Sequence, residues 1–254
     1  MSCSFLTITP EVFQIGGPGF TDAEDAAIYL VAIGDHAALI DAGCGRSVDR
    51  LLANATACGV RLADVDTLLL THCHFDHTGG AAELQARLDL RVVIHSLDAP
   101  YVEVADPVVT AAAWYGATLQ PFRPDRILAD TTEEIWIGHR RIQAIHVPGH
   151  SPGSVVYLLE SDDQKILFGQ DVHGPLHPSL KSDPMAYRHS LQRLIDLGAD
   201  VLCEGHFGII EGADRVKRFI GQYLVERRHD ACGQDWRMTA RSMMNAHSWI
   251  SSRR

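Results

Sequence analysis

One histidine-rich segment constrains the fold and the chemistry of this chain more than any other part of it. Residues 71–77 read Thr-His-Cys-His-Phe-Asp-His, directly follow the apolar run 66–70 and precede two glycines at 79–80. An apolar run this short, bounded by turn residues, predicts a buried strand rather than a helix. The segment therefore lies where a rigid strand passes into a loop, which is where functional side chains are commonly held.

The spacing within this segment suits metal coordination. Side chains at i and i+2 of an extended chain point the same way, so His72 and His74 can share one metal ion. Asp76 and His77 fall in the turn that follows and can face a second ion. Cys73 points away from its two neighbours by the same alternation, and we expect it to pack as a small core residue.

Three further polar residues each follow an apolar strand. His150 lies in Val-Pro-Gly-His-Ser-Pro-Gly-Ser, Asp171 ends the run that begins at Lys165, and His206 follows the run that begins at Val201. A single histidine is usually structural or solvated. An ordered set in which every member follows a strand instead indicates a metal site on a rigid scaffold.

The complete set contains five imidazoles and two carboxylates. It supplies three ligands to each of two ions, with one carboxylate shared, and leaves a shared position for water. These ligand types suit zinc, which we expect first, and also iron or manganese. Water between two cations has a lowered pKa and becomes a hydroxide nucleophile. The seven expected ligands are His72, His74, Asp76, His77, His150, Asp171 and His206.

The order of predicted elements indicates a layered α/β fold. Apolar residues make up 46% of the 254 residues, enough for a sizeable core. A four-layer αββα sandwich fits the order, and a doubly wound parallel sheet fits less well because the strands between 134 and 168 lack crossover helices. The predicted strands are 12–15, 27–33, 37–40, 66–70, 92–95, 134–137, 141–147, 154–159, 165–168 and 201–202, and the predicted helices are 47–58, 81–88, 185–197 and 216–227.

We expect a single domain over residues 1–254. A looser, small-residue stretch at about 97–125 predicts a helical insertion. Residues from about 213 to 254 predict a helical tail, which is rich in arginine although the chain as a whole is acidic. A frayed or partner-binding tail is the plainest interpretation of that contrast.

Composition limits the partners of the chain. A net charge of -10 argues against a nucleic-acid partner. The start resembles no signal peptide, and the longest apolar stretch, 26–40, is broken by polar residues, so we expect a cytoplasmic protein without a membrane partner. Six scattered cysteines without a CxxC pair predict free thiols. The sequence leaves a homodimer open.

The expected ligands resemble, in order and approximate spacing, the signature of the metallo-β-lactamase superfamily. The resemblance spans roughly residues 12–210 by element order and implies the sandwich fold of that family. Segment 29–43, ending in Leu-Ile-Asp-Ala-Gly, looks like the family's early strand pair, with no direct metal role carried to Asp41. The resemblance assigns His72, His74 and His150 to one ion, Asp76, His77 and His206 to a second, and the bridging position to Asp171.

The family contains several reaction types, and local features separate them. The run 148–154 is similar to the signature of glyoxalase II and of sulfur dioxygenases, and 183–194 looks like thioesterase-type members. Flavin-linked members have Glu where His74 stands, and acyl-homoserine lactonases have an oxyanion-stabilising Tyr where Gly174 stands.

We therefore predict a dinuclear metal-dependent hydrolase of thioesterase or lactonase type. Its metal-bound hydroxide would attack a small-molecule ester, thioester or lactone. Asp76 would orient the water, Asp171 would bridge the ions and His173 would donate a hydrogen bond to the developing oxyanion. Two alternatives stay open: a mononuclear iron persulfide dioxygenase, and a non-catalytic regulatory or binding member of the fold.

Three aromatic residues are candidates for substrate contact. Trp114 and Tyr115 lie in the predicted insertion and can form an apolar lid, although core packing explains them as well. Tyr187 begins the helix after the Asp171 loop and can face the site or pack on the body.

Overall fold

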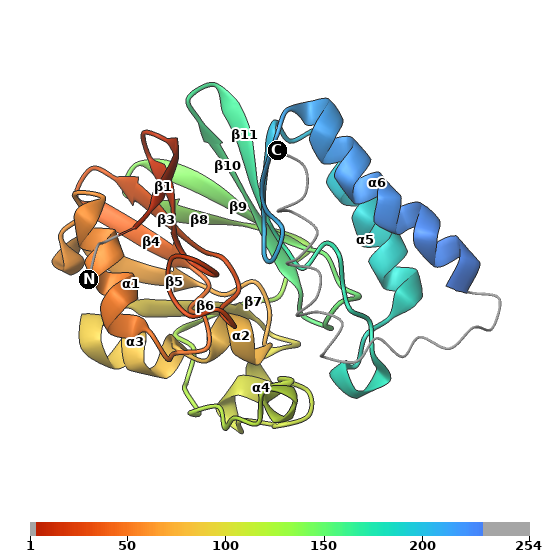
Figure 1. Ribbon diagram of the computed structural model, residues 1–254, viewed down its shortest axis with the longest axis horizontal. Coiled ribbons are helices and arrows are strands. Elements are labelled where there is room, and N and C mark those ends of the chain that lie inside the picture. Colours follow the sequence, from red (N-terminus) through yellow and green to blue (C-terminus); the bar gives the residue numbers. More distant parts are fainter. Residues whose placement is uncertain (1–3, 231–254) are drawn as a thin grey trace.

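A computed structural model describes residues 4–230 and shows two β-sheets packed face to face, each covered on its outer side by helices (Figure 1). The predicted αββα sandwich is therefore confirmed. The first sheet has the order β1 (Leu6–Thr9), β2 (Val12–Gly16), β3 (Ile28–Ile33), β4 (His36–Ile40), β5 (Val65–Leu69), β6 (Arg91–His95) and β7 (Arg126–Leu128). The second has the order β13 (Gly208–Glu211), β12 (Val201–Glu204), β11 (Gln164–Gln170), β10 (Val155–Ser161), β9 (Arg140–His146) and β8 (Thr132–Ile137).

Three apolar clusters hold the four layers together. The first lies between the outer face of the first sheet and the helices α1 (Val48–Ala57), α3 (Ala81–Leu88) and α4 (Ala99–Glu103). The second fills the space between the two sheets. The third lies between the second sheet and the helices α5 (Pro184–Asp196) and α6 (Ala213–Asp230). Each fully buried leucine or isoleucine in these clusters contributes about 1.5–3 kcal/mol.

Strand direction explains why the expected ligands can meet. Strands β4, β5 and β6 are parallel, so their carboxyl ends lie at one edge of the first sheet. In the second sheet β9 and β11 are both antiparallel to β10, and β12 is parallel to β11, so β9, β11 and β12 also end at one edge. Every expected ligand follows β5, β9, β11 or β12. The sandwich brings these two edges together.

Helix α5 supports the loop that follows β11. The carboxylate of Asp183 accepts hydrogen bonds from the backbone N–H groups of Met185 (2.8 Å) and Ala186 (3.0 Å), which caps the helix. Pro184 occupies the first turn, where its missing N–H costs nothing. Leu191 and Leu194 then face the third cluster and fix the helix to the sheet.

Several short elements were not predicted from the sequence. Strands β1, β7 and β13 have four, three and four residues, and α2 (Phe75–Thr78) is a single helical turn within the histidine-rich segment. Such short edge elements are fixed by neighbouring strands rather than by local pattern. The insertion contains α4 and a 3-10 turn, η2 (Ala112–Tyr115). The predicted tail is helical through Asp230, and its remainder, 231–254, lies outside the described residues.

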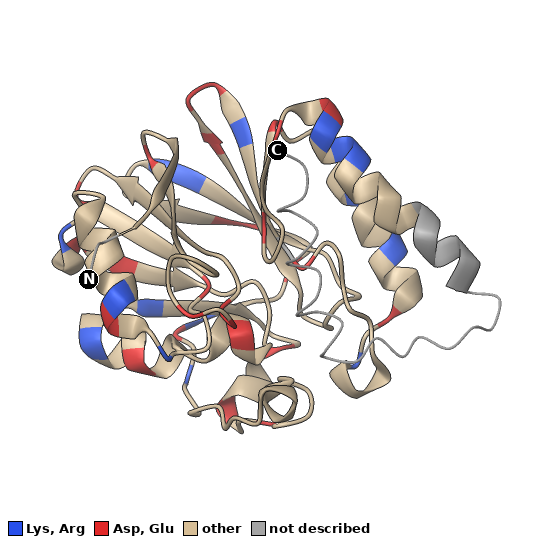
Figure 2. Ribbon diagram, in the orientation of Figure 1, with Lys and Arg blue, Asp and Glu red and all other residues tan. Residues whose placement is uncertain are grey.

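Acidic and basic residues are interspersed along the outer helices and turns (Figure 2). Over residues 4–230, no helix is long and apolar enough to cross a membrane.

Two buried tyrosines connect the sheets at the edge where the ligands lie. The hydroxyl of Tyr157, on β10, donates to the carbonyl of Leu70 at 2.8 Å, two residues before His72. The hydroxyl of Tyr29, on β3, donates to the carbonyl of Glu204 at 2.9 Å, two residues before His206. Each sheet thus holds the backbone that leads into a ligand of the other.

We expect Tyr157→Phe to lower the free energy of unfolding by about 1–3 kcal/mol, because the buried Leu70 carbonyl loses its partner. Chemical denaturation of the metal-free protein measures this change. Tyr101→Phe, on the surface helix α4, is the matched control and should change stability little. Equal stability of the Tyr157 variant and the wild type would show that the connection contributes nothing.

Candidate metal centre

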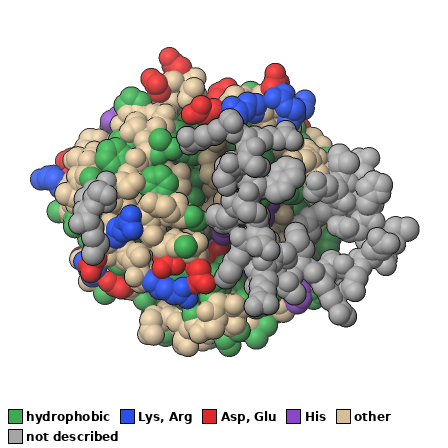
Figure 3. Space-filling view, viewed as in Figure 1, with side chains coloured by type: hydrophobic (Ala, Val, Ile, Leu, Met, Phe, Trp, Pro, Cys, Tyr) green, Lys and Arg blue, Asp and Glu red, His purple; other side chains and the backbone are tan. Residues whose placement is uncertain are grey.

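Three imidazoles converge at the edge of the sandwich. His72 Nε2 lies 3.0 Å from His74 Nδ1 and 3.2 Å from His150 Nε2. The three side chains come from the β5 and β9 loops and are almost fully buried. In the space-filling view only a few histidine atoms (purple) reach the surface (Figure 3). Together with Asp171, these nitrogens form a group whose ligand atoms lie within 4.8 Å of one another.

A second group of potential ligands lies beside the first. It consists of Asp76, His77 and His206, again with ligand atoms within 4.8 Å. His206 Nε2 is 3.2 Å from Asp76 Oδ2. All seven predicted ligands are therefore found at one place, in two adjacent sets.

Asp171 lies between the two sets. Its Oδ1 is 3.1 Å from His77 Nε2 and 3.2 Å from His206 Nε2, whereas its Oδ2 is 3.3 Å from His150 Nε2. One carboxylate thus presents a different oxygen to each set. This arrangement is the one that a bridging ligand requires.

The donor set fits a pair of cations. His77 Nε2 and Asp171 Oδ1 are fully buried and make no hydrogen bond to any described residue, although they face each other. Buried polar atoms nearly always have a partner, so such a pair needs an explanation. A divalent ion toward which both atoms point supplies it, and imidazole with carboxylate is a typical zinc, iron or manganese donor set.

In His77 and His150, the nitrogen that points away from the centre, Nδ1, has a hydrogen-bond acceptor that fixes a proton on it. His77 Nδ1 is 2.7 Å from Asp41 Oδ2, and because an ionised carboxylate only accepts, Nδ1 carries the proton. His150 Nδ1 donates to the carbonyl of Pro175 at 2.9 Å for the same reason. With Nδ1 carrying that proton, each ring can present Nε2 to a metal ion, as metal-binding histidines do.

Asp41 also controls His72, through a hydroxyl. Thr71 Oγ1 donates its only proton to Asp41, 2.8 Å away at Oδ2, so toward His72 Nδ1, 3.0 Å away, it can only accept. Asp41 therefore sets the proton positions of one ring in each donor group. The sequence had suggested no direct metal role for Asp41, and its influence here is indirect.

The glycines that follow the motif allow Asp41 to come this close. A Cβ atom on Gly79 would lie 2.5 Å from the Cys44 carbonyl oxygen, and one on Gly80 would lie 2.4 Å from that of Ala42. Both glycines have ordinary negative φ angles. Both glycines are needed because no side chain would fit against the loop after β4.

Asp98 holds the two ligand loops of the first set together. This fully buried carboxylate accepts from the N–H groups of Cys73 (2.9 Å) and Gly153 (2.7 Å) and from the hydroxyl of Ser151 (2.6 Å). It thus joins the loop of His72 to the loop of His150. Sequence reasoning missed it, because a single aspartate after β6 resembles an ordinary turn residue.

Burial and charge set the protonation states. Burial, followed by the neighbouring imidazoles, lowers the pKa of His74 to about 3 and holds the pKa of His72 well below its usual range. Burial alone would raise the pKa of Asp76, but His77 and His206 bring it to about 2. The same two histidines hold the pKa of Asp171 well below its usual range despite burial. Burial alone would lower the pKa of His77 and His206, but Asp171 and the neighbouring carboxylates raise it well above the usual range, so these two imidazoles would release a proton on binding a metal ion. The ionised carboxylates are already in the form that binds metals.

The candidate substrate residues lie in different places. Tyr115 packs its ring 5.6 Å from that of Phe75, and its hydroxyl interacts with Asp76, so it forms part of the wall of the centre. Trp114 is 39% exposed and meets the ring of His177 edge-on, which joins the insertion to the loop after Asp171.

Tyr187 is 2% exposed in the third cluster, and its hydroxyl donates to the Val172 carbonyl. That packing corrects the expected substrate contact of Tyr187, because its polar end is used inside the protein.

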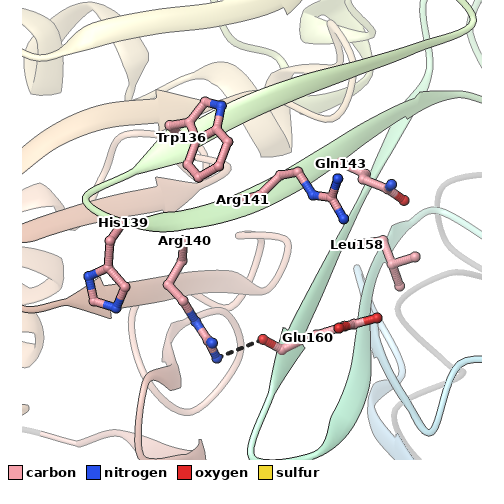
Figure 4. Close-up of a pocket in the computed structure, with 7 residues that line it drawn as sticks. All are labelled: Trp136, His139, Arg140, Arg141, Gln143, Leu158 and Glu160. Carbon is pink, nitrogen blue, oxygen red and sulfur yellow. Dashed lines mark hydrogen bonds between the residues drawn. The ribbon is translucent and has the colours of Figure 1, made fainter.

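A separate pocket lies on the outer face of the β8–β9 hairpin (Figure 4). Its arginines are already paired: Arg140 donates to the Glu160 carbonyl at 2.8 Å and to Glu11 at 3.0 Å, and Arg141 contacts Glu134 at 2.8 Å. The hairpin turn lies at the opposite end of β9 from His150. This pocket is therefore not part of the metal centre.

Comparisons with known proteins identify the family. The family model described as the metallo-beta-lactamase superfamily matches residues 21–206, and the chain belongs to this superfamily. Two solved structures share the fold, each with a TM-score of 0.74 at 22% identity. The first is a motif mutant of a metallo-beta-lactamase from Cronobacter sakazakii, and the match covers 91% of this chain and 97% of that one. The second is the Rm3 metallo-beta-lactamase, and the match covers 92% of this chain and 96% of that one.

Several curated relatives of this chain are named for the reaction that they catalyse. The acyl-coenzyme A thioesterase MBLAC2 of Homo sapiens is 30% identical over 242 residues, covering 84% of each chain. The atrochrysone carboxyl ACP thioesterase of Aspergillus fumigatus is 26% identical over 80% of this chain and 58% of that one. The hydroxyacylglutathione hydrolase of Anaeromyxobacter dehalogenans is 36% identical over 52% of this chain and 42% of that one. These relatives support a metal-dependent hydrolase in general.

We expect Asp41→Asn to weaken metal binding at the donor set that contains His77 by about 10–100-fold, because the charge that holds the His77 ring is lost. Competition with a chromogenic chelator measures the affinity of both ions. The matched control is Asp66→Asn, which removes the charge from an exposed histidine–aspartate pair with His36. An unchanged affinity in the Asp41 variant would contradict the proposed control of the ligand rings.

Proposed function

We propose that the protein is a dinuclear metallohydrolase that cleaves thioesters of small acyl groups, with related esters and lactones as weaker substrates. The observation that carries the proposal is the position of Asp171, whose two oxygens face two different donor sets. Seven side chains that could bind a metal ion are more than a mononuclear centre needs.

The choice of thioesters is supported by the relatives. Two of those compared are named thioesterases, and the first of them spans most of both chains. The hydroxyacylglutathione hydrolase is named for a thioester substrate class as well, although it matches only about half of this chain. Gly174 stands where a lactonase of this family would place a tyrosine, so lactones are the less favoured substrates.

The residues of the centre would divide the work as follows. Two bound cations would lower the pKa of water to near neutrality and polarise the substrate carbonyl. Asp76 is ionised and lies at the second set, where it would orient that water and accept its proton. Burial, then the nearby Asp76, raises the pKa of Tyr115, so its hydroxyl stays protonated and remains a hydrogen-bond donor in the wall of the site.

The role first expected of His173 changes with its surroundings. Its Nδ1 lies 2.9 Å from Glu204 Oε1 and donates a hydrogen bond to this oxygen. In the neutral ring Nε2 then has a lone pair and accepts rather than donates. An oxyanion donor is therefore not the role that this geometry favours for His173.

We expect the purified protein to bind two divalent ions per chain. The Asp171→Ala variant should lose most of the second ion and should also lose thioesterase activity. Losing this carboxylate leaves two cations unscreened at close range. The measurements are elemental analysis and hydrolysis of acyl-coenzyme A, acylglutathione and homoserine lactone substrates. Asp196→Ala, a change on the outer helix α5, is the control. Full turnover by the Asp171 variant would refute the bridging role.

We expect His77→Ala to separate this function from a mononuclear iron persulfide dioxygenase. His77 belongs only to the second donor set, so the hydrolase should lose more than about a hundredfold in rate, the scale of losing the metal-activated base. A dioxygenase that used only the first set should keep most of its rate. Anaerobic thioester hydrolysis and oxygen uptake with glutathione persulfide are measured side by side. Oxygen uptake that survives the change, without anaerobic hydrolysis by the wild type, would favour the dioxygenase.

A further inference from the structure

His173 lies next to the second donor set without belonging to the family signature. It follows Asp171 by two residues in the turn after β11, and one of its ring nitrogens lies within 4.8 Å of the ligand atoms of Asp171 and His206. Ligands of one zinc ion, at about 2.0–2.2 Å each, lie at most about 4.4 Å apart. A small movement of the side chain would therefore bring His173 to the same ion as its two neighbours.

Glu204 fixes the position of the His173 ring. This glutamate is the last residue of β12 and is fully buried. Oε1 accepts from His173 Nδ1 at 2.9 Å, and Oε2 accepts from the backbone N–H groups of His206 at 2.7 Å and Phe207 at 2.8 Å. One carboxylate therefore holds the ring of His173 and the backbone of the ligand His206 at the same time.

The pair of Glu204 and His173 repeats the pair of Asp41 and His77. In both, a buried carboxylate accepts a hydrogen bond from Nδ1 and leaves Nε2 to face a metal ion, as in the carboxylate–histidine–metal arrangement. The two imidazoles also flank His206 in a similar way. Ring centroids are 5.5 Å apart at 71° for His77 and 5.0 Å apart at 74° for His173.

We propose that His173 is an additional ligand of the ion at the second position, and that Glu204 is the residue that positions it. The inference rests on the two metal positions of the proposed function. His173 is grouped with Asp171 and His206, and His206 also belongs to the set of Asp76 and His77, so the second ion would then have these five side chains as its protein donors.

Five protein donors would change which metal ion the second position prefers. Structural and catalytic zinc sites commonly use three or four protein ligands, whereas octahedral iron or manganese accepts more. The two positions would therefore differ in metal preference, with a near-tetrahedral first position and a second position of higher coordination number.

The test is proton NMR of the protein loaded with Co²⁺ alone. Ring N–H protons of histidines bound to Co²⁺ are shifted far outside the ordinary spectrum, so each ligand gives a countable signal. We expect His173→Ala to lose one exchangeable shifted signal and to bind the second Co²⁺ about 10–100-fold more weakly. The control is His36→Ala, which removes a histidine from an exposed pair with Asp66 and should keep every signal.

Glu204→Gln tests the positioning role without removing the ligand. The amide keeps the size of the side chain but loses the charge, so the signal from His173 should remain, with a changed shift and faster exchange with solvent. Thermal unfolding of the metal-free variants confirms that they fold. An unchanged spectrum and unchanged Co²⁺ affinity in His173→Ala would overturn the inference while leaving the proposed function intact. Failure of the wild type to bind a second Co²⁺ would refute both.

Discussion

The structure depends on packing ionised carboxylates and imidazoles together at the edge of the sandwich, where nearly all of them are buried. Such a cluster is unfavourable by itself, because burial penalises charge and leaves polar atoms without partners. Here Asp171 is almost fully buried, yet it remains ionised because its two oxygens face histidines of both donor sets. The same cluster becomes favourable when cations neutralise it. The free energy of metal binding would therefore contribute directly to the free energy of folding.

The expected ligands are held in place by hydrogen bonds to carboxylates that are not themselves among the seven expected ligands. Asp41 fixes rings in both sets, Asp98 joins two ligand loops and Glu204 holds a ring and a ligand backbone. Each of these carboxylates is buried and follows or ends a strand, so the sheet edge positions the supporting groups together with the ligands. A substitution in this layer would change metal affinity without removing a single ligand.

The sequence predicted the layered fold and the seven ligands because both have local signals: apolar runs of strand length, and histidines or aspartates directly after them. It did not reveal Asp98 or Glu204, since their importance comes from contacts that join residues far apart in the chain, such as Asp98 with Gly153. Tyr187 was misplaced for a related reason, because an aromatic at the start of a helix has no local sign of whether it faces a pocket or the core. Edge strands such as β7 are similarly set by their neighbours.

The reciprocal tyrosine hydrogen bonds have a consequence for how such a chain can change during evolution. They lie at the ligand edge, whereas the β8–β9 and β10–β11 turns lie at the opposite ends of their strands. New segments added at those distant turns would leave the backbone before His72 and His206 where it is. Lineages can therefore acquire appended domains there while keeping the same chemistry, and they can diversify substrates by altering the insertion that carries Trp114 and Tyr115.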